Sequence, residues 1–375
     1  MKVLTLVGTR PELIKLSETI KELDRSVEHT LVHTGQNYDY ELNQVFFEQL
    51  GIRKPDYFLE AAANNTAATI ANVIQKTDAI LEKVKPDAFL IYGDTNSCLG
   101  VIAAKRKQIP IFHMEAGNRC FDQRVPEEIN RKIIDHLSDI NMVLSEHARR
   151  YLIREGIGQE TIIKTGSSMQ EILKEHKQKI ELSKVLTQEK LSKDSYIIVS
   201  AHREENIDSE ENFKALLETL EAIQKHFNKV LIVSTHPRTK NKLKATGFIN
   251  QNKEIRFMKP FGFFEYIKLQ KEAFCVISDS GTITEEASLL KIPAVTIRQA
   301  HERPEGMDEG TVIMTGLNPD NVIRAIQVSR NHFEDTVPFE AVQDYVVESV
   351  SKKVVKIILS YTGYINRTVW RKNDL

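Results

Sequence analysis

The segment DSGTITEE, residues 279–286, combines small hydroxyl residues, a glycine and two carboxylates in an order that suits nucleotide binding. It follows the apolar run 273–277, so its Ser-Gly-Thr (280–282) should lie where a strand turns into a helix. The first N–H groups of a helix lack partners and carry the positive end of the helix dipole, which makes them suited to a diphosphate. Glu285 and Glu286, one turn later, can accept hydrogen bonds from sugar hydroxyls. An ordinary capped helix with early glutamates accounts for the same residues equally well.

Cations follow the first apolar run of the chain. In GTRPE, which begins at Gly8, Arg10 comes just before a helix-like stretch, and Lys15 follows one turn later. A guanidinium and an ammonium at this point could hold a phosphate. A solvent-facing pair of cations is an equally good explanation of these two residues alone.

Carboxylates follow two further apolar runs. Asp94 comes after the run 88–92, and Glu115 comes after the run that starts at Ile109. A partly desolvated carboxylate at a strand end can have its pKa raised and act as an acid or a base. Taken singly, Asp94 is explained better as a helix cap, and Glu115 as part of a structural ion pair.

The segment RVPEEINR, residues 124–131, adds a third acidic position. A proline followed by glutamates is typical of a helix start, so Glu127 and Glu128 could serve only the helix dipole. Asn130 and Arg131 weaken that explanation. Asp94, Glu115 and Glu127 with Arg131 nearby would form a proton-transfer cluster balanced by a cation.

In the second half of the chain, histidines follow the apolar runs. His202 could donate a proton to a departing phosphate, because imidazole exchanges protons near neutral pH. A single histidine is more often structural. The pattern recurs in THPR from Thr235 and HERPE from His301, and this recurrence at strand ends favours a site.

Composition sets the class of protein. The chain has 375 residues, 41% hydrophobic and 27% charged, with a net charge of -1, which gives no electrostatic footprint for nucleic acid or membrane. The three cysteines are scattered without metal-type spacing, and the first residues already read as a strand rather than a signal peptide. We therefore expect a cytoplasmic protein with no nucleic-acid or membrane partner.

Several cofactor and nucleophile motifs are missing. The sequence has no G-x-G-x-x-G after a strand, no G-x-x-x-x-G-K-[ST], no metal-ligand spacing and no serine or cysteine elbow. These absences disfavour a tightly bound dinucleotide, ATP hydrolysis and zinc chemistry, so we expect neither a cofactor nor a metal site.

Short apolar runs alternate with amphipathic stretches along the chain. This alternation predicts an α/β fold with parallel strands and crossover helices, in which ligands bind beyond the carboxyl ends of the strands. The expected helices include 12–23 and 66–84, and the expected strands are 3–7, 29–33, 88–92, 109–113, 140–144, 196–200, 230–234, 255–258, 273–277 and 294–297. The Lys- and Glu-rich stretch 169–194 separates two such sets and is expected to connect two domains.

Taken in order, these motifs resemble those of the non-hydrolysing UDP-N-acetylglucosamine 2-epimerase family along nearly the whole chain. The matching segments are GTRPELIK from Gly8, YGDTNS from Tyr92, HMEAGNR from His113, PEEINR from Pro126, AHREEN from Ala201, DSGTITEE from Asp279 and HERPE from His301. The resemblance implies two Rossmann-like doubly wound domains facing across a cleft (GT-B type). The implied domains are 1–168 with the catalytic carboxylates, 169–355 for UDP, and a C-terminal helix, 356–375, that returns to the first domain.

The resemblance also implies roles for individual residues. The residues that match the catalytic set are Lys15, Asp94, Glu115, Glu127, Arg131 and His202. Those that match UDP contacts are Arg10, Tyr266, Ser280, Gly281, Thr282 and Glu286, with Glu286 on the ribose and Tyr266 near the uracil. A homodimer is implied as well.

The chemistry implied by the resemblance is elimination and re-addition. A carboxylate removes the proton on carbon 2 while UDP leaves carbon 1, and UDP re-adds after a proton reaches the opposite face. Acid and base groups on both sugar faces, cations for UDP and a closed site would serve this reaction.

Other segments resemble one branch of that family. HTGQNYDY from His33, CFDQRVPEEINRK from Cys120 and SYTGYINRTVWRK from Ser360 look like the branch that makes UDP-N-acetyl-L-fucosamine for capsule or O-antigen. That branch epimerises UDP-2-acetamido-2,6-dideoxy-L-talose. Thr282 replaces a glycine usual in the N-acetylglucosamine enzymes, and the loop at Gln36 differs from theirs. The alternatives are a UDP-N-acetylglucosamine 2-epimerase, a GT-B glycosyltransferase and a non-catalytic UDP-sugar sensor.

Overall fold

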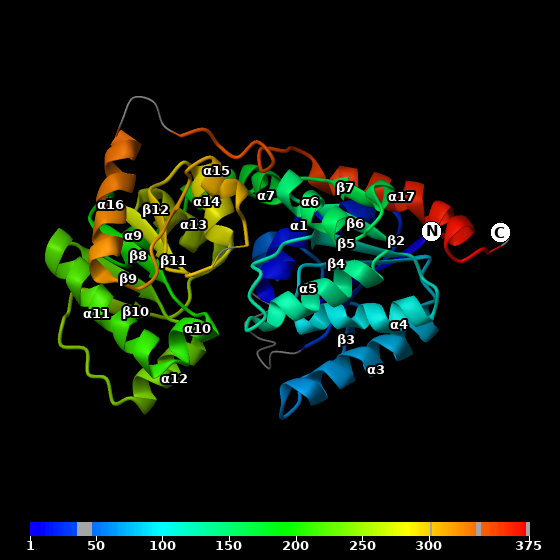
Figure 1. The fold of residues 1–375 in the computed structure, drawn as a ribbon, viewed down its shortest axis with the longest axis horizontal. Helices are drawn as coiled ribbons and strands as arrows, with labels where there is room; N and C mark the ends of the chain where they lie inside the picture. The colour runs from blue at the N-terminus through cyan, green and yellow to red at the C-terminus, as the bar shows by residue number, and fades with distance from the viewer. Residues whose placement is uncertain (36–46, 301, 335–338, 373–375) are drawn as a thin grey trace. The chain divides into compact units, whose positions relative to one another are not determined.

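The computed structural model describes residues 1–35, 47–300, 302–334 and 339–372. The chain divides into two compact units. The first consists of Met1–Leu173 together with Asp344–Leu375, and the second of Lys174–Gln343. Each unit is built around its own parallel β-sheet (Figure 1).

The sheet of the first unit has seven strands in the order β3-β2-β1-β4-β5-β6-β7. Every described strand pair in it is parallel, and the side chains of the central strands are almost entirely buried, as in sheets covered on both faces. The strands are β1 (Lys2–Val7), β2 (Glu28–His33), β3 (Tyr57–Phe58), β4 (Ala88–Tyr92), β5 (Ile111–Ala116), β6 (Ile140–Val143) and β7 (Ile162–Lys164).

Helices connect these strands, and the last helix of the chain also belongs to this unit. Helix α17 packs against α1 in the first unit, so the C-terminal segment lies beside the N-terminal one (Figure 1). The helices are α1 (Arg10–Ser26), α3 (Thr66–Val84), η1 (Asn96–Gly100), α4 (Val101–Arg106), α5 (Pro126–Leu137), α6 (Glu146–Arg154), η2 (Gln159–Thr161), α7 (Met169–Glu175) and α17 (Val350–Thr368).

The sheet of the second unit has six parallel strands in the order β10-β9-β8-β11-β12-β13. Alternate residues of β8 belong to different cores: Ile197 and Val199 pack on one face, Tyr196 and Ile198 on the other. The sheet therefore has a hydrophobic layer on both sides. Its strands are β8 (Tyr196–Ser200), β9 (Val230–Ser234), β10 (Ile255–Met258), β11 (Cys275–Ser278), β12 (Ala294–Thr296) and β13 (Ile313–Met314).

The second unit's helices include three short ones in the stretch 169–194 that was expected to connect two domains, one of them shared with the first unit. They are α7, already given, α8 (Lys177–Glu181) and α9 (Val185–Gln188). The others are α10 (Glu204–Ile207), α11 (Glu210–Phe227), α12 (Pro237–Ala245), α13 (Phe263–Glu272), α14 (Thr282–Leu290), α15 (Glu305–Asp308) and α16 (Pro319–Glu334). Among the helices that the structure describes, none is both long and apolar enough to cross a bilayer.

The strand orders confirm two Rossmann-like doubly wound sheets. In such sheets the strand order reverses at a switch point, and ligands bind beyond the carboxyl ends of the strands there. The reversal lies between β1 and β4 in the first sheet and between β8 and β11 in the second. The loops after these four strands carry GTRPE, GDTNS, AHREEN and DSGTITEE, which are the segments singled out by their chemistry.

Candidate functional site

Asp94 follows strand β4 after a glycine turn. Gly93 has a φ of 74°, a conformation that glycine adopts without strain, and it turns the chain so that Asp94 leaves the sheet. The explanation of Asp94 as a helix cap is wrong, because the side chain of Thr95 accepts the hydrogen bond from Ser97 N at the start of η1. Asp94 keeps 24% of its side-chain surface exposed and can therefore meet a ligand.

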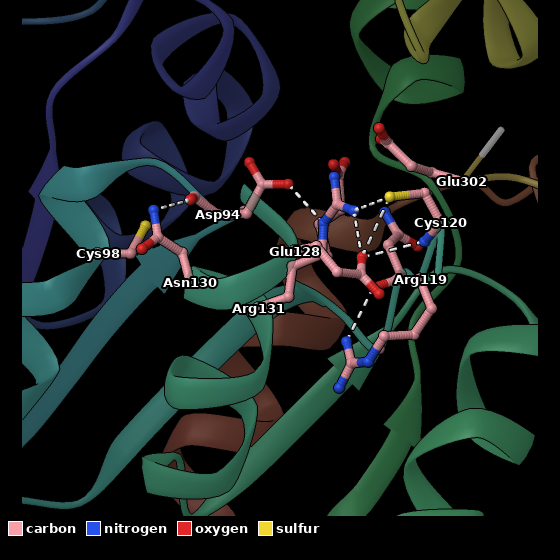
Figure 2. A network of polar contacts seen from close by, with 12 residues as sticks. Asp94, Cys98, Arg119, Cys120, Glu128, Asn130, Arg131 and Glu302 are labelled. Atoms are coloured by element: carbon pink, nitrogen blue, oxygen red, sulfur yellow. Dashed lines mark hydrogen bonds and ion pairs between the residues drawn. The ribbon is translucent and has the colours of Figure 1, made fainter. Parts of the chain in front are cut away.

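Arg131 holds Asp94 from helix α5. Its Nε donates to Asp94 Oδ2 at 2.8 Å, and its Nη1 donates to Glu128 Oε2 at 2.8 Å (Figure 2). Only 3% of the Arg131 side chain is exposed. Asn130, the neighbour on the same helix, donates to the backbone carbonyl of Asp94 at 2.9 Å. Two consecutive residues of α5 thus fix both the carboxylate and the backbone of Asp94.

Glu128 holds the guanidinium of Arg131 and is itself held by backbone groups. It accepts from the backbone N–H groups of Cys120 and Phe121 at 3.0 and 3.1 Å. Burial alone would raise the pKa of Glu128, but the Cys120 N–H and the Arg131 guanidinium bring that pKa below its usual value. Glu127, by contrast, is only half-buried in the first turn of α5. Of the two glutamates, Glu128 is committed to internal contacts.

Glu115 lies within strand β5, and the expected strand 109–113 is displaced. The strand runs from Ile111 to Ala116, because its pairing with β6 shifts register between Met114 and Ala116 and then resumes. Glu115 is the residue at this irregularity and has a φ of 62°, which is rare for a residue other than glycine. The turned backbone redirects its side chain, and the Tyr92 hydroxyl donates to its carboxylate.

His113 and Asp135 form a buried pair that was not predicted from the sequence. His113 Nε2 donates to the Gly93 carbonyl at 2.7 Å, and its Nδ1 lies 2.9 Å from Asp135 Oδ1. Asp135 also accepts from Gly117 N and from Arg119 Nη1. Gly93, directly before Asp94, and Gly117, two residues after Glu115, are therefore both bonded to one buried polar network.

The two cations of the GTRPE segment differ in exposure. Arg10 is the first residue of α1 and is half-exposed, whereas Lys15 is 97% buried one turn further on. The explanation of both as a solvent-facing pair is therefore wrong for Lys15. Glu12, between them, is also buried and accepts from Gly8 N at 2.6 Å.

The DSGTITEE segment begins helix α14, as expected. Ser280 Oγ lies 2.9 Å from Thr282 Oγ1, and α14 starts at Thr282. A Cβ on Gly281 would come within 3.1 Å of Glu302 Oε2, so this position leaves little room for a larger residue. The strand-to-helix turn therefore presents two hydroxyls and a closely packed backbone at a helix N-terminus, where an anion is favoured.

His202 is fixed by the first residue of that same segment. Asp279 is fully buried and accepts from His202 N at 2.9 Å, Arg203 N at 3.0 Å and Asn206 Nδ2 at 3.0 Å. The His202 ring is 40% exposed, and its Nδ1 lies 3.5 Å from Asp279 Oδ1. The pairing of Ser278 with Ser200 places Asp279 beside the His202 loop, and this strand register is known only from the structure.

Tyr266 and Gln270 both lie on helix α13, and Gln270 links this helix to Glu286. Gln270 Nε2 donates to Glu286 Oε2 at 2.7 Å. Burial raises the pKa of the Tyr266 phenol, and the negative charge of Glu286 raises it further. Glu285 differs from its expected part in sugar binding, because it is fully buried and paired with Arg303 at 2.8 Å.

Arg203 and Arg298 form a cluster around Glu302 next to the start of α14, and the sequence did not predict it. Arg203 and Arg298 both reach Glu302 Oε1, at 3.0 and 2.9 Å. Glu302 belongs to the HERPE segment, so that segment was the sequence signal for this cluster.

Two predicted features lie outside the described residues. They are His301 of the HERPE segment and the loop at Gln36, including residues 36–40 of HTGQNYDY. Within the described residues, no group of three or more His, Cys, Asp or Glu is placed to hold a metal ion.

Several of the predicted residues thus lie in the loops beside the switch point of their unit's sheet. In the first unit, Asp94 and Arg131 are in direct contact, Glu115 lies on β5, which pairs with β4, and Lys15 lies on helix α1. In the second unit, His202 and the DSGTITEE segment are joined through Asp279. The two sets are contributed by different units.

Comparison with known proteins identifies the family. The model of the UDP-N-acetylglucosamine 2-epimerase family matches residues 21–359. A solved UDP-N-acetylglucosamine 2-epimerase from Rickettsia bellii is 55% identical, with a TM-score of 0.92 over 99% of this chain and 100% of that one.

Two further relatives are more distant in sequence. The UDP-N-acetylglucosamine 2-epimerase of Methanocaldococcus jannaschii is 34% identical over 88% of this chain and 93% of its own length. Its structure in complex with UDP-GlcNAc and UDP has a TM-score of 0.90, covering 96% of this chain and 100% of that one. A UDP-2,3-diacetamido-2,3-dideoxy-D-glucuronate 2-epimerase of Pseudomonas aeruginosa is 34% identical over 88% of this chain and 92% of its own. The chain therefore belongs to the UDP-N-acetylglucosamine 2-epimerase family and is an isomerase of the epimerase type.

Proposed function

We propose that the protein inverts carbon 2 of a UDP-N-acetylhexosamine by eliminating UDP and adding it back. Membership of the epimerase family supports this activity. The observation that carries it is the pair of carboxylates on neighbouring strands of the first sheet: Asp94 follows β4, Glu115 lies at the irregularity near the end of β5, and a buried arginine fixes Asp94. Such carboxylates can exchange a proton with carbon, provided that they stay in fixed positions.

In the proposed first step, one carboxylate takes the proton from carbon 2. The electrons of that C–H bond form the double bond between carbons 1 and 2, and the C1–O bond breaks with its electron pair leaving on UDP. In the reverse step, a proton is added to carbon 2 on the opposite face and a UDP oxygen attacks carbon 1. We assign these proton transfers to Asp94, Glu115 and Glu127, with Arg131 as the balancing cation.

Cations favour the departure of UDP, because negative charge develops on the leaving diphosphate. We assign this part to Arg10, Lys15 and His202. Asp279 supports that assignment for His202, because it holds the backbone of the His202 loop while leaving the ring exposed.

The proposed UDP half of the site is the start of α14. Ser280, Gly281 and Thr282 would hold the diphosphate, because the first N–H groups of a helix favour an anion. Glu286 would bind the ribose hydroxyls, and Tyr266 would lie beside the uracil. The contact between Gln270 and Glu286 supports a fixed position for that carboxylate.

For the sugar, we propose UDP-2-acetamido-2,6-dideoxy-L-talose, converted to UDP-N-acetyl-L-fucosamine for capsule or O-antigen in the cytoplasm by a homodimer. The segments from Cys120 and Ser360 and the threonine at position 282 support this assignment through their resemblance to that branch. UDP-N-acetylglucosamine is the second candidate, and the names of most relatives favour it. The relative named for a diacetamido-glucuronate sugar supports variation of the sugar within the family.

The test of the substrate is a direct comparison. The purified protein is incubated separately with each of the two UDP-sugars, without an acceptor, and the configuration at carbon 2 is followed by NMR. The proposal predicts faster inversion of the L-talose sugar. Faster inversion of UDP-N-acetylglucosamine contradicts the proposed sugar, and no inversion of either contradicts the proposed activity.

A further inference from the structure

Glu12 has contacts on two separate loops of the first unit. One carboxylate oxygen, Oε2, accepts from Gly8 N at 2.6 Å and from Thr9 N at 3.3 Å, which closes the start of helix α1. The other oxygen, Oε1, accepts a short hydrogen bond from the hydroxyl of Thr95. Thr95 is separated from Glu12 by 83 residues and directly follows Asp94. A single buried carboxylate therefore joins the start of α1, where Arg10 lies, to the loop that carries Asp94.

The two loops are also packed without spare room. A Cβ on Gly8 would come within 1.7 Å of Ser97 Oγ and 2.3 Å of Thr34 Oγ1, so only glycine fits this approach. Ser97 and Thr34 are themselves hydrogen-bonded at 2.7 Å. Because the side chains of Ser97 and Thr34 pack directly against the Gly8 backbone, the contact between Glu12 and Thr95 lies beside a closely packed junction, where a shift of either segment would disturb the packing.

An ordinary capping role explains only half of this geometry. A glutamate at the third position of a helix reaches back to the N-cap backbone, which accounts for the contacts of Oε2. It does not account for Oε1, which faces the Asp94 loop rather than the helix. Burial raises the pKa of Glu12 to about 7. The contact survives in both protonation states, because the Thr95 hydroxyl can donate to a carboxylate or accept from a protonated carboxyl.

We infer that Glu12, through Thr95, is a positioning residue that sets the place of Asp94 relative to Arg10 and Lys15. This inference rests on the proposed function, because it assigns Glu12 a part in bringing the proton-transfer carboxylate and the cations for UDP into one geometry. A displacement of about 1 Å in such a group can slow a reaction about 100-fold.

The test uses four variants in the full chain. T95V removes the hydroxyl with little change in volume, and T95S restores it. E12A removes the carboxylate but leaves Thr95 to cap η1, and the double variant E12A/T95V completes the cycle. We expect T95V and E12A each to lower kcat about 10- to 100-fold with KM changed less than about threefold. T95S should recover kcat to within about threefold of the unaltered protein, and the double variant should be no slower than the slower single variant.

Glu171 provides a matched control. It also accepts from a backbone N–H and a hydroxyl, those of Ser351, at 2.9 and 2.5 Å, but it joins α7 to α17. E171A should therefore reproduce any general loss of packing without the loss of kcat. The inference is overturned if T95V stays within about twofold of the unaltered protein, if E171A slows the reaction as E12A does, or if the effects of E12A and T95V multiply.

Thermal unfolding of the same variants separates this inference from the proposed function. If the two residues act through one contact, the loss of unfolding free energy in E12A/T95V is smaller than the sum of the two single losses. Additive losses overturn the contact whatever the activity. A protein that inverts neither UDP-sugar contradicts the proposed function, while the unfolding cycle still decides whether Glu12 and Thr95 are coupled.

Discussion

The guanidinium of Arg131 lies 2.8 Å from the carboxylate of Asp94 and is itself almost wholly buried. Its second arm is held by Glu128, which in turn accepts two backbone N–H groups of the Cys120 turn. Asp94 is thus placed by a chain of contacts that ends in backbone rather than in another mobile side chain. Catalytic groups supported in this way keep their geometry when a ligand binds.

Replacing Arg131 should affect activity more than charge alone would suggest. In R131K the ammonium keeps the charge, but it cannot reproduce the fork that reaches Asp94 and Glu128 together. We expect kcat to fall about 100-fold. R124K is the control, because Arg124 makes a forked contact with Asp122 but is 87% exposed. Equal turnover of R131K and the unaltered protein would contradict the assigned role.

The positive φ of Glu115 can be separated from its carboxylate. E115G and E115A both lose the carboxylate, so both should lose epimerisation. E115G should nevertheless be more stable than E115A by about 1 kcal/mol, because glycine accepts the left-handed backbone without strain. Chemical denaturation of the two variants measures the difference. Lys85, with a φ of 48° at the end of α3, allows the same comparison away from the site, and K85G should stay active.

Asp279 should matter although it need not touch the substrate. In D279N one carboxylate oxygen becomes an NH₂ group, which would face the His202 N–H in the place of Oδ1, or the donors of His202, Arg203 and Asn206 in the place of Oδ2. A buried donor left without an acceptor costs about 1–3 kcal/mol. We expect a lower melting temperature and a lower kcat. D320N, on an exposed residue of α16, should melt like the unaltered protein, and the same result for D279N would contradict this account.

The pH dependence of stability should reveal Glu12. Its pKa is about 7 in the folded chain because the carboxyl is buried, against an ordinary value of 4.5. Between these values the unfolded chain releases a proton that the folded chain retains, so stability is lost as pH rises from about 4.5 to 7. Glutamine does not titrate. E12Q should therefore become more stable relative to the unaltered protein across that range, by up to about 3 kcal/mol above pH 7.

Melting curves at pH 5, 6, 7 and 8 test this prediction. The neighbouring acidic groups remain in both proteins: Asp94, and the Cys98 thiol, whose pKa is raised by burial and by the charges of Glu12 and Asp94. The Cys98 thiol stays protonated from pH 5 to pH 8 in both proteins, because its pKa lies well above its ordinary value, so it does not contribute to the difference. A difference in stability that stays constant from pH 5 to pH 8 would show that Glu12 does not titrate in this range.

Much of the fold could be predicted because the strands are short, buried and bounded by polar turns. The expected runs 88–92, 196–200, 230–234 and 255–258 coincide with β4, β8, β9 and β10. In a parallel sheet such runs are apolar on both faces, so the sequence marks their ends clearly. The residues after them could then be expected at one edge of each sheet.

The details that position the candidate residues were less visible. The shift of β5 depends on the backbone turn at Glu115, and a glutamate gives no sign of a positive φ. Asp279 and Glu128 could not be distinguished from their neighbours, because burial and partners depend on strand register and on the Cys120 turn. Patterns of residue type therefore indicate which end of each sheet carries the candidate residues. The contacts that hold those residues in place depend on tertiary structure.

The central claim is that a proton on carbon 2 is exchanged during elimination of UDP. Incubation of the protein with its UDP-sugar in D₂O, without an acceptor, tests it most directly by NMR of carbon 2. The account predicts deuterium at carbon 2 of the product, and loss of this incorporation in D94N and E115Q. Inversion with the original hydrogen retained at carbon 2, or undiminished incorporation in both variants, would contradict it.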